Sequence, residues 1–187
     1  MYGLPNAPLQ PRLTFTGGVF GYNWHRVFWL AAAQQSIPLE FHQSTHICDG
    51  MSVLDSYAAY FRRLAVGGAS VNFSMRPNLS RILTGRFFET VLSGALLVQE
   101  ETPDMAYYLT PGEHFLSFRS ISELRAIVRF IDEAPEQAEV IRRCGNDFAR
   151  AHYNDESLIG YLDAMLSSSQ QSAGRADLSA GQSLHLT

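Results

Sequence analysis

The fold is decided by the stretch Val71-Asn-Phe-Ser-Met-Arg-Pro-Asn78 and by the segment after it, Arg86-Phe-Phe-Glu-Thr-Val-Leu-Ser-Gly-Ala-Leu-Leu-Val-Gln-Glu100. The first segment is typical of a strand followed by a polar loop. The second predicts a short helix opening with Arg86 and Glu89, a stop at Gly94 and another apolar strand. In an α/β protein, ligands bind where loops leave the carboxyl ends of parallel strands. The polar residues of both segments are therefore candidates for a site.

The same alternation of strand and helix extends through the first hundred residues. Strands are expected at 13–16, 38–42, 70–74 and 95–99, and helices at 24–34, 54–64 and 86–93. Helices of about ten residues that connect such strands predict a parallel sheet covered on both faces. We expect Phe15, Phe41, Val71 and Leu97 to lie in interior strands. The loops after Thr16, Ser74 and Gln99 should then share one edge of the sheet.

The second half of the chain has the patterns of helices. Short strands are expected at 107–109 and 114–118, and a capping box at Ser120–Glu123 and a first-turn proline at Pro135 open two helices. The sequence thus predicts a single α/β Rossmann-like domain over 13–166 with a helical carboxyl-terminal part, an extended arm over 1–12 and a disordered tail over 167–187. Helical spacing predicts these shared faces: Trp24, Val27, Phe28 and Ala31; Leu54, Tyr57, Ala58, Phe61 and Leu64; Leu124, Ile127, Val128 and Ile131; and Ile141, Cys144, Phe148 and Ala151.

The composition excludes several classes of protein. The chain has 187 residues, of which 46% are hydrophobic and 17% charged, and this balance is typical of one globular domain. A net charge of −4 gives no electrostatic footprint for duplex nucleic acid. All 14 residues counted as Lys or Arg are arginines. An enzyme that needs a Schiff-base or P-loop lysine is therefore excluded, and an anion site must use arginine, histidine or backbone N–H groups.

Cysteine usage and hydropathy predict a cytoplasmic protein. Cys48 and Cys144 lie far apart in the sequence, in no metal-ligand spacing, and we expect both to be reduced, buried or half-buried thiols. The first residues have neither the basic region nor the apolar run of a signal peptide. No stretch approaches the roughly 20 apolar residues that a membrane span needs.

The segment from Arg76 to Glu89 carries the groups best suited to a nucleotide. Glu89, near a helix start, can accept two hydrogen bonds from a vicinal diol such as that of a ribose. It can equally pair with Arg86, three residues away on the same helix. Arg76, Arg81 and Arg86 can together hold a diphosphate at a helix start, or they are ordinary surface charge.

Three further groups of residues have two readings each. Gly17 and Gly18, after the first strand, can let the backbone approach a phosphate with Arg26 adding charge, or they form a plain tight turn. Asn72 and Ser74 alternate on one side of an interior strand, where a neighbouring loop or a ligand must satisfy them.

Glu100 and Glu101, at a strand end, face either the site or a solvated loop. The histidines show no ligand spacing, with His25 and His42 as minor site candidates, and there is no Asp-x-Asp pair, so we expect no metal.

The motif Asn72-x-Ser74 … Arg86-x-Phe-Glu89-x-x-x-Ser93-Gly … Pro111-Gly-Glu113 … Phe118 … Glu123-Leu124 resembles the carboxyl-terminal domain of group 1 glycosyl transferases, and within them the spore-maturation-type subgroup. The resemblance extends from about residue 13 to 162. It implies one of the two Rossmann-like halves of a GT-B fold, which binds a nucleotide-sugar donor. It also implies that Glu89 contacts the donor ribose, that Arg86 faces the donor phosphates and that Asn72 and Ser74 lie near the sugar or diphosphate.

Two departures from that family affect the functional expectation. Many members of the wider superfamily have a second acidic residue eight positions before the one matching Glu89, where this chain has Arg81. The amino-terminal, acceptor-binding half has no counterpart in these residues, although transfer depends on closure of a cleft.

We therefore expect the donor-binding domain of a metal-independent glycosyltransferase. It would need no cofactor beyond its nucleotide diphosphate sugar and would work with an acceptor domain supplied in trans. The alternative is a non-catalytic nucleotide-sugar-binding module or a split-gene fragment. Arg86 and Glu89 are the catalytic candidates, and the donor-binding candidates are Gly17, Gly18, Asn72, Ser74 and Arg76.

Overall fold

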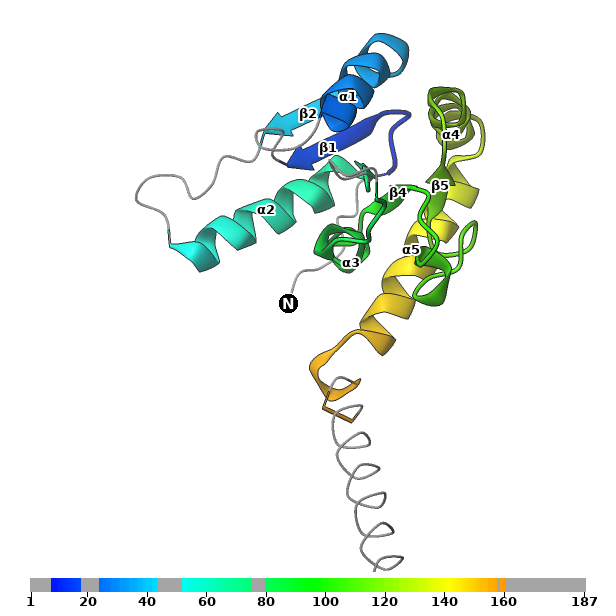
Figure 1. Ribbon diagram of the computed structural model, residues 1–187. Coiled ribbons are helices and arrows are strands. Elements are labelled where there is room, and N and C mark those ends of the chain that lie inside the picture. Colours follow the sequence, from blue (N-terminus) through cyan, green and yellow to red (C-terminus); the bar gives the residue numbers. More distant parts are fainter. Residues whose placement is uncertain (1–7, 18–23, 44–51, 75–79, 158, 161–187) are drawn as a thin grey trace, which may run out of the picture. The chain divides into compact units, whose positions relative to one another are not determined.

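The protein contains a five-stranded, wholly parallel sheet with the strand order β2-β1-β3-β4-β5. The computed structural model describes residues 8–17, 24–43, 52–74, 80–157 and 159–160 (Figure 1). The strands are β1 (Leu13–Gly17), β2 (Leu39–Gln43), β3 (Ala69–Asn72), β4 (Leu96–Glu100) and β5 (Leu116–Phe118). The predicted α/β class and parallel sheet are confirmed.

Helices connect the strands and follow the last one. They are α1 (Trp24–Ser36), α2 (Val53–Gly67), α3 (Gly85–Leu92), α4 (Ile121–Glu133) and α5 (Pro135–His152), with a 3-10 turn η1 (Met105–Tyr107). Helices α1 and α2 lie on opposite sides of β1 and β2 (Figure 1). Helix α1 contacts α4, whereas α2 contacts α3, so the sheet is covered on both faces. The contacts divide the chain into a unit ending at Ala149 and a second unit beginning at Arg150.

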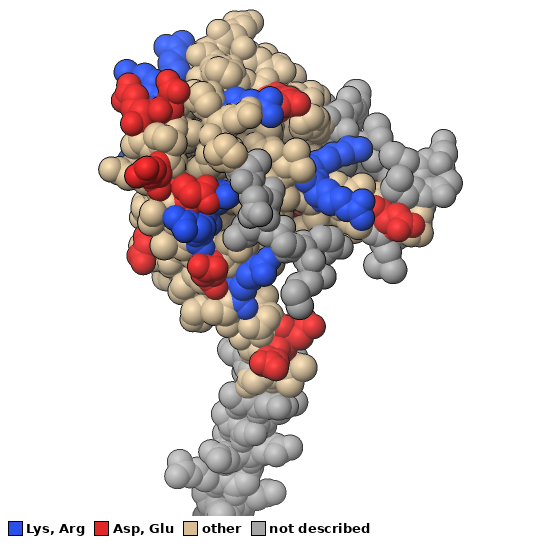
Figure 2. Space-filling model, turned by 180° about the vertical axis from the view of Figure 1, so that it is seen from behind, with Lys and Arg blue, Asp and Glu red and all other residues tan. Residues whose placement is uncertain are grey.

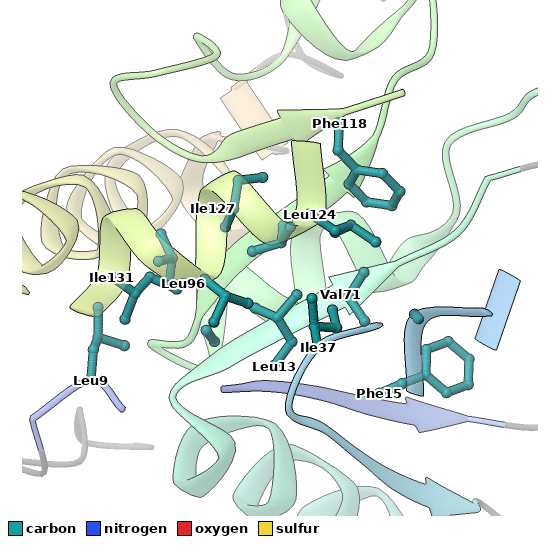
Figure 3. Packing of buried hydrophobic residues seen from close by; sticks show 14 of the residues in the cluster. Leu9, Leu13, Phe15, Ile37, Val71, Leu96, Phe118, Leu124, Ile127 and Ile131 are labelled. Carbon is teal, nitrogen blue, oxygen red and sulfur yellow. The ribbon is translucent and has the colours of Figure 1, made fainter. Parts of the chain in front are cut away.

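The core lies between the sheet and the α1–α4 layer (Figure 3). Leu13 and Phe15 of β1, Val71 of β3 and Leu96 of β4 are at most 1% exposed. Helix α4 buries the four residues that its spacing predicts, Leu124, Ile127, Val128 and Ile131. Leu9, within the expected arm, is 8% exposed and belongs to the same cluster.

Two predictions about strands are wrong. Phe41 lies in β2, which is an edge strand of the described sheet and not an interior one. Its ring is nevertheless stacked on Phe15 with the centroids 5.7 Å apart, because the parallel register places these two residues side by side. Of residues 107–109, expected as a strand, Tyr107 ends the 3-10 turn η1 and the next two form a turn and a bend. Tyr107 is 85% exposed there, so the aromatic run does not signal a buried strand.

The buried faces of α1 and α5 differ from the predicted ones. In α1, Val27 and Phe28 are 50% and 63% exposed, and the buried stripe contains Arg26, Leu30 and Ala33. The pattern was misleading because it counts arginine as polar, although its long stem can be buried.

In α5 the buried residues are Ala138, Arg142, Gly145, Asn146 and Ala149, and Cys144 is exposed. This face includes Gly145 because its Cα lies against the backbone of His114: a Cβ there would come within 2.1 Å of the His114 carbonyl oxygen. Asn146 is buried on this face because its side chain donates to the carbonyl oxygen of Val91, at the end of α3, at 2.6 Å.

The charge and length of the described elements complete this description. On the face shown in Figure 2, arginine and acidic side chains are interspersed. None of the helices in the described part of the chain combines the length and apolar character needed to cross a bilayer.

Candidate functional site

The strand order of the sheet reverses at β1, and the carboxyl ends of β1 and β3 lie side by side there. From β1 the chain passes outward to β2 and then returns to β3 on the other side of β1. Such a reversal of strand order is the place where parallel α/β sheets bind ligands. The carboxyl ends of β1, β3 and β4 share this edge because all the strands are parallel, as predicted.

Arg86 of α3 lies against the end of β1. Its guanidinium carbon is 5.3 Å from the centroid of the buried Phe15 ring, within the range of a cation–π contact. A Cβ on Gly17 would come within 2.4 Å of Arg86 Nη2, so only glycine leaves room for this placement. Gly17, the last residue of β1, therefore leaves room for the Arg86 guanidinium.

Glu89, one turn further along α3, accepts hydrogen bonds from two tyrosines of α2. The Tyr57 hydroxyl donates to Oε1 at 2.9 Å and the Tyr60 hydroxyl donates to Oε2 at 2.8 Å. Tyr60 also accepts a long hydrogen bond from Arg86 Nε at 3.4 Å. Within the described residues, Arg86 and Glu89 form no direct ion pair, and the Tyr60 hydroxyl joins them instead.

Burial and the Glu89 carboxylate keep the two phenols protonated. Burial raises the pKa of Tyr60 to about 12, although the Arg86 charge and hydrogen bond oppose this rise and Glu89 adds to it. The hydrogen bond to Glu89 is the main cause that raises the pKa of Tyr57, followed by the Glu89 charge and by burial. Both hydroxyls therefore remain neutral donors to the carboxylate near pH 7.

A buried polar network joins the carboxyl ends of β3 and β4. Asn72 Nδ2 donates to Gln99 Oε1 at 2.7 Å, and Gln99 Nε2 donates to Ser74 Oγ. The Ser74 amide donates to Glu100 Oε2 at 2.8 Å. All four side chains are at most 1% exposed. Protein partners thus satisfy most of this network, while Asn72 Oδ1 has no hydrogen-bond partner in the described part of the chain.

A second arginine from α1 reaches the same ring of β1. Arg26 is 3% exposed, donates to the Phe73 carbonyl oxygen at 3.2 Å and lies 5.9 Å from the Phe15 centroid. Arg81 is exposed, and its Nη1 lies 3.5 Å from the Glu101 carbonyl oxygen. Of the predicted arginines that the structure describes, Arg86 and Arg26 reach Phe15.

The remaining predicted residues are placed as follows. Gly18, Arg76 and the side chain of His25 lie outside the described residues. His42, in β2, lies 3.1 Å from Glu40. Among the described residues, no three histidine, cysteine or acidic side chains gather as metal ligands, and metal independence stays a prediction.

Sequence reasoning missed two contributors and undervalued a third. Tyr57 was assigned to an apolar stripe, yet it is 53% exposed. Two tyrosines three residues apart share one helix face, and this spacing was the available signal for a hydroxyl pair. Of the two readings for Glu100, the solvated loop is wrong: the residue is 1% exposed because it ends β4, which lies between β3 and β5.

The fold is similar to that of several solved glycosyltransferases. Sucrose-phosphate synthase from Thermosynechococcus elongatus matches with a TM-score of 0.59 at 16% identity, over 88% of this chain and 47% of that one. The GtfA/B complex matches with a TM-score of 0.57 at 14% identity, over 89% and 38%. The carboxyl-terminal domain of a group 1 glycosyl transferase from Francisella tularensis matches with a TM-score of 0.51 at 8% identity, over 82% and 96%.

These proportions define what the chain corresponds to. It spans less than half the length of the first two structures but nearly all of the isolated carboxyl-terminal domain. Its α/β domain has the carboxyl-terminal-like fold of a GT-B glycosyltransferase. A comparison with curated proteins gave no match. The sequence profile of the glycosyl transferase-like family matches residues 10–162, most of the chain, and the protein therefore belongs to the glycosyl transferase-like family.

Proposed function

We propose that this chain binds the nucleotide-sugar donor of a glycosyltransferase at the carboxyl ends of β1 and β3. The arrangement of Glu89, Tyr60 and Arg86 carries this proposal. It presents a carboxylate and a guanidinium side by side without neutralising them against each other. A nucleoside diphosphate sugar offers the matching groups, a vicinal diol and a diphosphate.

Glu89 is the proposed ribose ligand. A carboxylate has about four acceptor positions, and the tyrosines occupy one on each oxygen. The two that remain suit the two hydroxyls of a ribose. Family membership supports this role, because the resemblance that identified Glu89 implies a ribose contact at this position.

Arg86 is the proposed ligand of the diphosphate. Its position at the first turn of α3 adds the backbone N–H groups of a helix start, and the side chain of Thr84 makes no capping hydrogen bond there. Charge builds up on the diphosphate as the sugar leaves, and a pre-positioned cation stabilises that charge in the transition state. We propose Gly17 as the residue that admits Arg86, and Asn72 and Ser74 as the wall facing the sugar or diphosphate.

We propose that the acceptor is bound by a different segment or chain. The lengths of the matched structures support this, since the chain corresponds to a carboxyl-terminal half. The alternative is a module that binds nucleotide sugar without transferring it, and the correspondence to a carboxyl-terminal half supports it equally. The two differ in turnover: a donor-binding half should acquire transfer or donor hydrolysis when its acceptor half is supplied, whereas a binding module should not.

Calorimetric titration of uridine and guanosine diphosphate sugars into the full chain tests the proposal. Hydrogen bonds to a charged group are worth about 1.5–3 kcal/mol each, so Glu89→Ala should weaken binding by about 10- to 100-fold or more. Glu133→Ala, on the exposed end of α4, is the matched control and should bind like wild type. Equal affinity of Glu89→Ala and wild type would remove Glu89 from the site. A wild-type chain that binds none of the nucleotides would refute the proposed function.

A further inference from the structure

The Tyr60 hydroxyl lies between the two charged groups of the site. It donates to Glu89 Oε2 at 2.8 Å and accepts from Arg86 Nε at 3.4 Å. We propose that Tyr60 is a positioning residue that keeps Arg86 and Glu89 apart, so that ribose and phosphate recognition are coupled. The coupling rests on the proposed function, because it matters only if the site binds a nucleotide. The bridge itself can be tested without a nucleotide.

The spacing on α3 explains why such a residue is needed. Arg86 and Glu89 are three positions apart, and side chains at that spacing on a helix are neighbours that readily pair. A direct pair would satisfy the guanidinium and the carboxylate with each other and leave less of both for a ligand. The Tyr60 hydroxyl occupies this position instead and links the two groups as a spacer.

The direction of the hydrogen bonds fits this role. A phenol has one proton to donate and lone pairs to accept. Because burial holds the pKa of Tyr60 near 12, the proton stays on the oxygen and points to the carboxylate. The chain of hydrogen bonds thus runs from guanidinium to phenol to carboxylate, and bonds in such a chain polarise one another.

Tyr57 provides a control within the same site. It makes the equivalent bond to the other Glu89 oxygen at 2.9 Å, but the residue is 53% exposed, and in the described part of the chain the Arg86 Nε bonds to Tyr60 and not to Tyr57. The two tyrosines therefore share the support of Glu89, and the link to Arg86 belongs to Tyr60. Tyr57→Phe and Tyr60→Phe each remove one hydroxyl from otherwise similar rings. Comparing them distinguishes the support of the Glu89 carboxylate from the link to Arg86.

The first test is the arginine Nε–H spectrum of the ¹⁵N-labelled chain. The Arg86 signal is assigned as the one lost in Arg86→Gln. We expect it to move in Tyr60→Phe, and to stay in place in Tyr57→Phe and in Tyr107→Phe, which alters an 85% exposed ring. An Arg86 signal that is unchanged in Tyr60→Phe would overturn the bridge, whether or not the protein binds nucleotides.

The second test measures the coupling with UDP or GDP, whichever the wild type binds. Loss of the diol in the 2′,3′-dideoxy analogue, or of one phosphate in UMP or GMP, should each weaken wild-type binding by about tenfold or more. In Tyr60→Phe, the loss of affinity on removing the diol and the loss on removing the phosphate should each fall to about threefold. In Tyr57→Phe, only the loss on removing the diol should become smaller.

The outcomes distinguish the two proposals. If Tyr60→Phe keeps both losses of affinity at the wild-type size, the coupling is refuted and the donor site survives. If the wild type binds neither nucleotide, the donor proposal fails, and the Arg86 spectrum still decides the bridge. Thermal melts of the three tyrosine variants check that each is folded before either test is interpreted.

Discussion

Two arginine–glutamate combinations in this protein differ in how their charges are used. At the surface between β4 and α4, Arg119 contacts both carboxylate oxygens of Glu101, with Nη2 2.8 Å from Oε1 and Nε next to Oε2. At the carboxyl edge of the sheet, Arg86 and Glu89 lie on one helix but meet through the Tyr60 hydroxyl. The residue types are the same, but only Arg86 and Glu89 have a third side chain, Tyr60, between their charges.

The difference separates a structural ion pair from a candidate binding site. Two parallel bonds between a guanidinium and a carboxylate use the geometry of both groups fully. The Arg119 side chain is 70% exposed, and such surface pairs contribute little to stability. Arg86 and Glu89 keep free hydrogen-bonding positions at the edge of the sheet where ligands bind. The following predictions compare the two combinations.

The largest expected effect is on nucleotide binding when each arginine loses its charge. Arg86→Gln should weaken UDP or GDP binding by about 10- to 100-fold, because charge-assisted hydrogen bonds to phosphate are worth about 1.5–3 kcal/mol. Arg119→Gln should leave the affinity within about twofold of wild type. Calorimetry on both variants measures the difference, and equal losses in the two would abolish the distinction drawn between the combinations.

The free energy of unfolding at alkaline pH should depend on Tyr60, which only the Arg86–Glu89 combination contains. The folded pKa of Tyr60 is about 12, against an ordinary value of 10. The unfolded chain therefore loses this proton first, and the contribution is intact below pH 10 and is lost as the pH rises toward 12. Urea unfolding at pH 9, 10 and 11 should show wild type losing up to about 1.4 kcal/mol per pH unit more than Tyr60→Phe at the upper end. If wild type and Tyr60→Phe lost stability equally between pH 9 and 11, the raised pKa of Tyr60 would be contradicted.

A smaller effect is expected from filling the space that Arg86 occupies. Alanine at position 17 would put its Cβ within 2.4 Å of Arg86 Nη2, and the guanidinium, as the end of a flexible side chain, must move. Gly17→Ala should therefore weaken diphosphate binding by about three- to tenfold while changing Tm by under about 4 °C. Gly160→Ala, where a Cβ meets nothing within 4 Å, is the control. A large drop in Tm with unchanged affinity would make Gly17 a folding residue instead.

The smallest effect should come from breaking the surface pair. Arg119→Ala should lower the free energy of unfolding by under about 1 kcal/mol, and 1 M salt should reduce the loss further, because exposed pairs are screened. Chemical denaturation at two salt concentrations measures it. A loss above about 2 kcal/mol would mean that Arg119 and Glu101 hold β4 and α4 together more strongly than an exposed pair should.

The sequence allowed the parallel sheet and most helix positions to be predicted, and it identified Arg86 and Glu89 as candidates for the site. Alternating strands and helices with glycine and proline stops are local signals, and they identified β1, β3, α3 and β4 closely. Glu89 and Arg86 are candidates because a helix start after an interior strand has a predictable place in an α/β sheet. The buried faces of α1 and α5 were not predicted, because the burial of arginine, asparagine and glycine there depends on the residues that they contact.

The sequence by itself therefore determined the type of fold and the residue types at the carboxyl edge of the sheet, where we propose that the donor binds. Only the tertiary structure decided how those residues are joined. It brought Tyr57 and Tyr60 of α2 to Glu89, set Arg86 against Gly17 and buried Glu100 beside Ser74. The physical reason is that each of these contacts joins residues from different elements. The packing of α2 on α3, the contact of α3 with the end of β1 and the pairing of β3 with β4 decide these contacts, and no local periodicity encodes them.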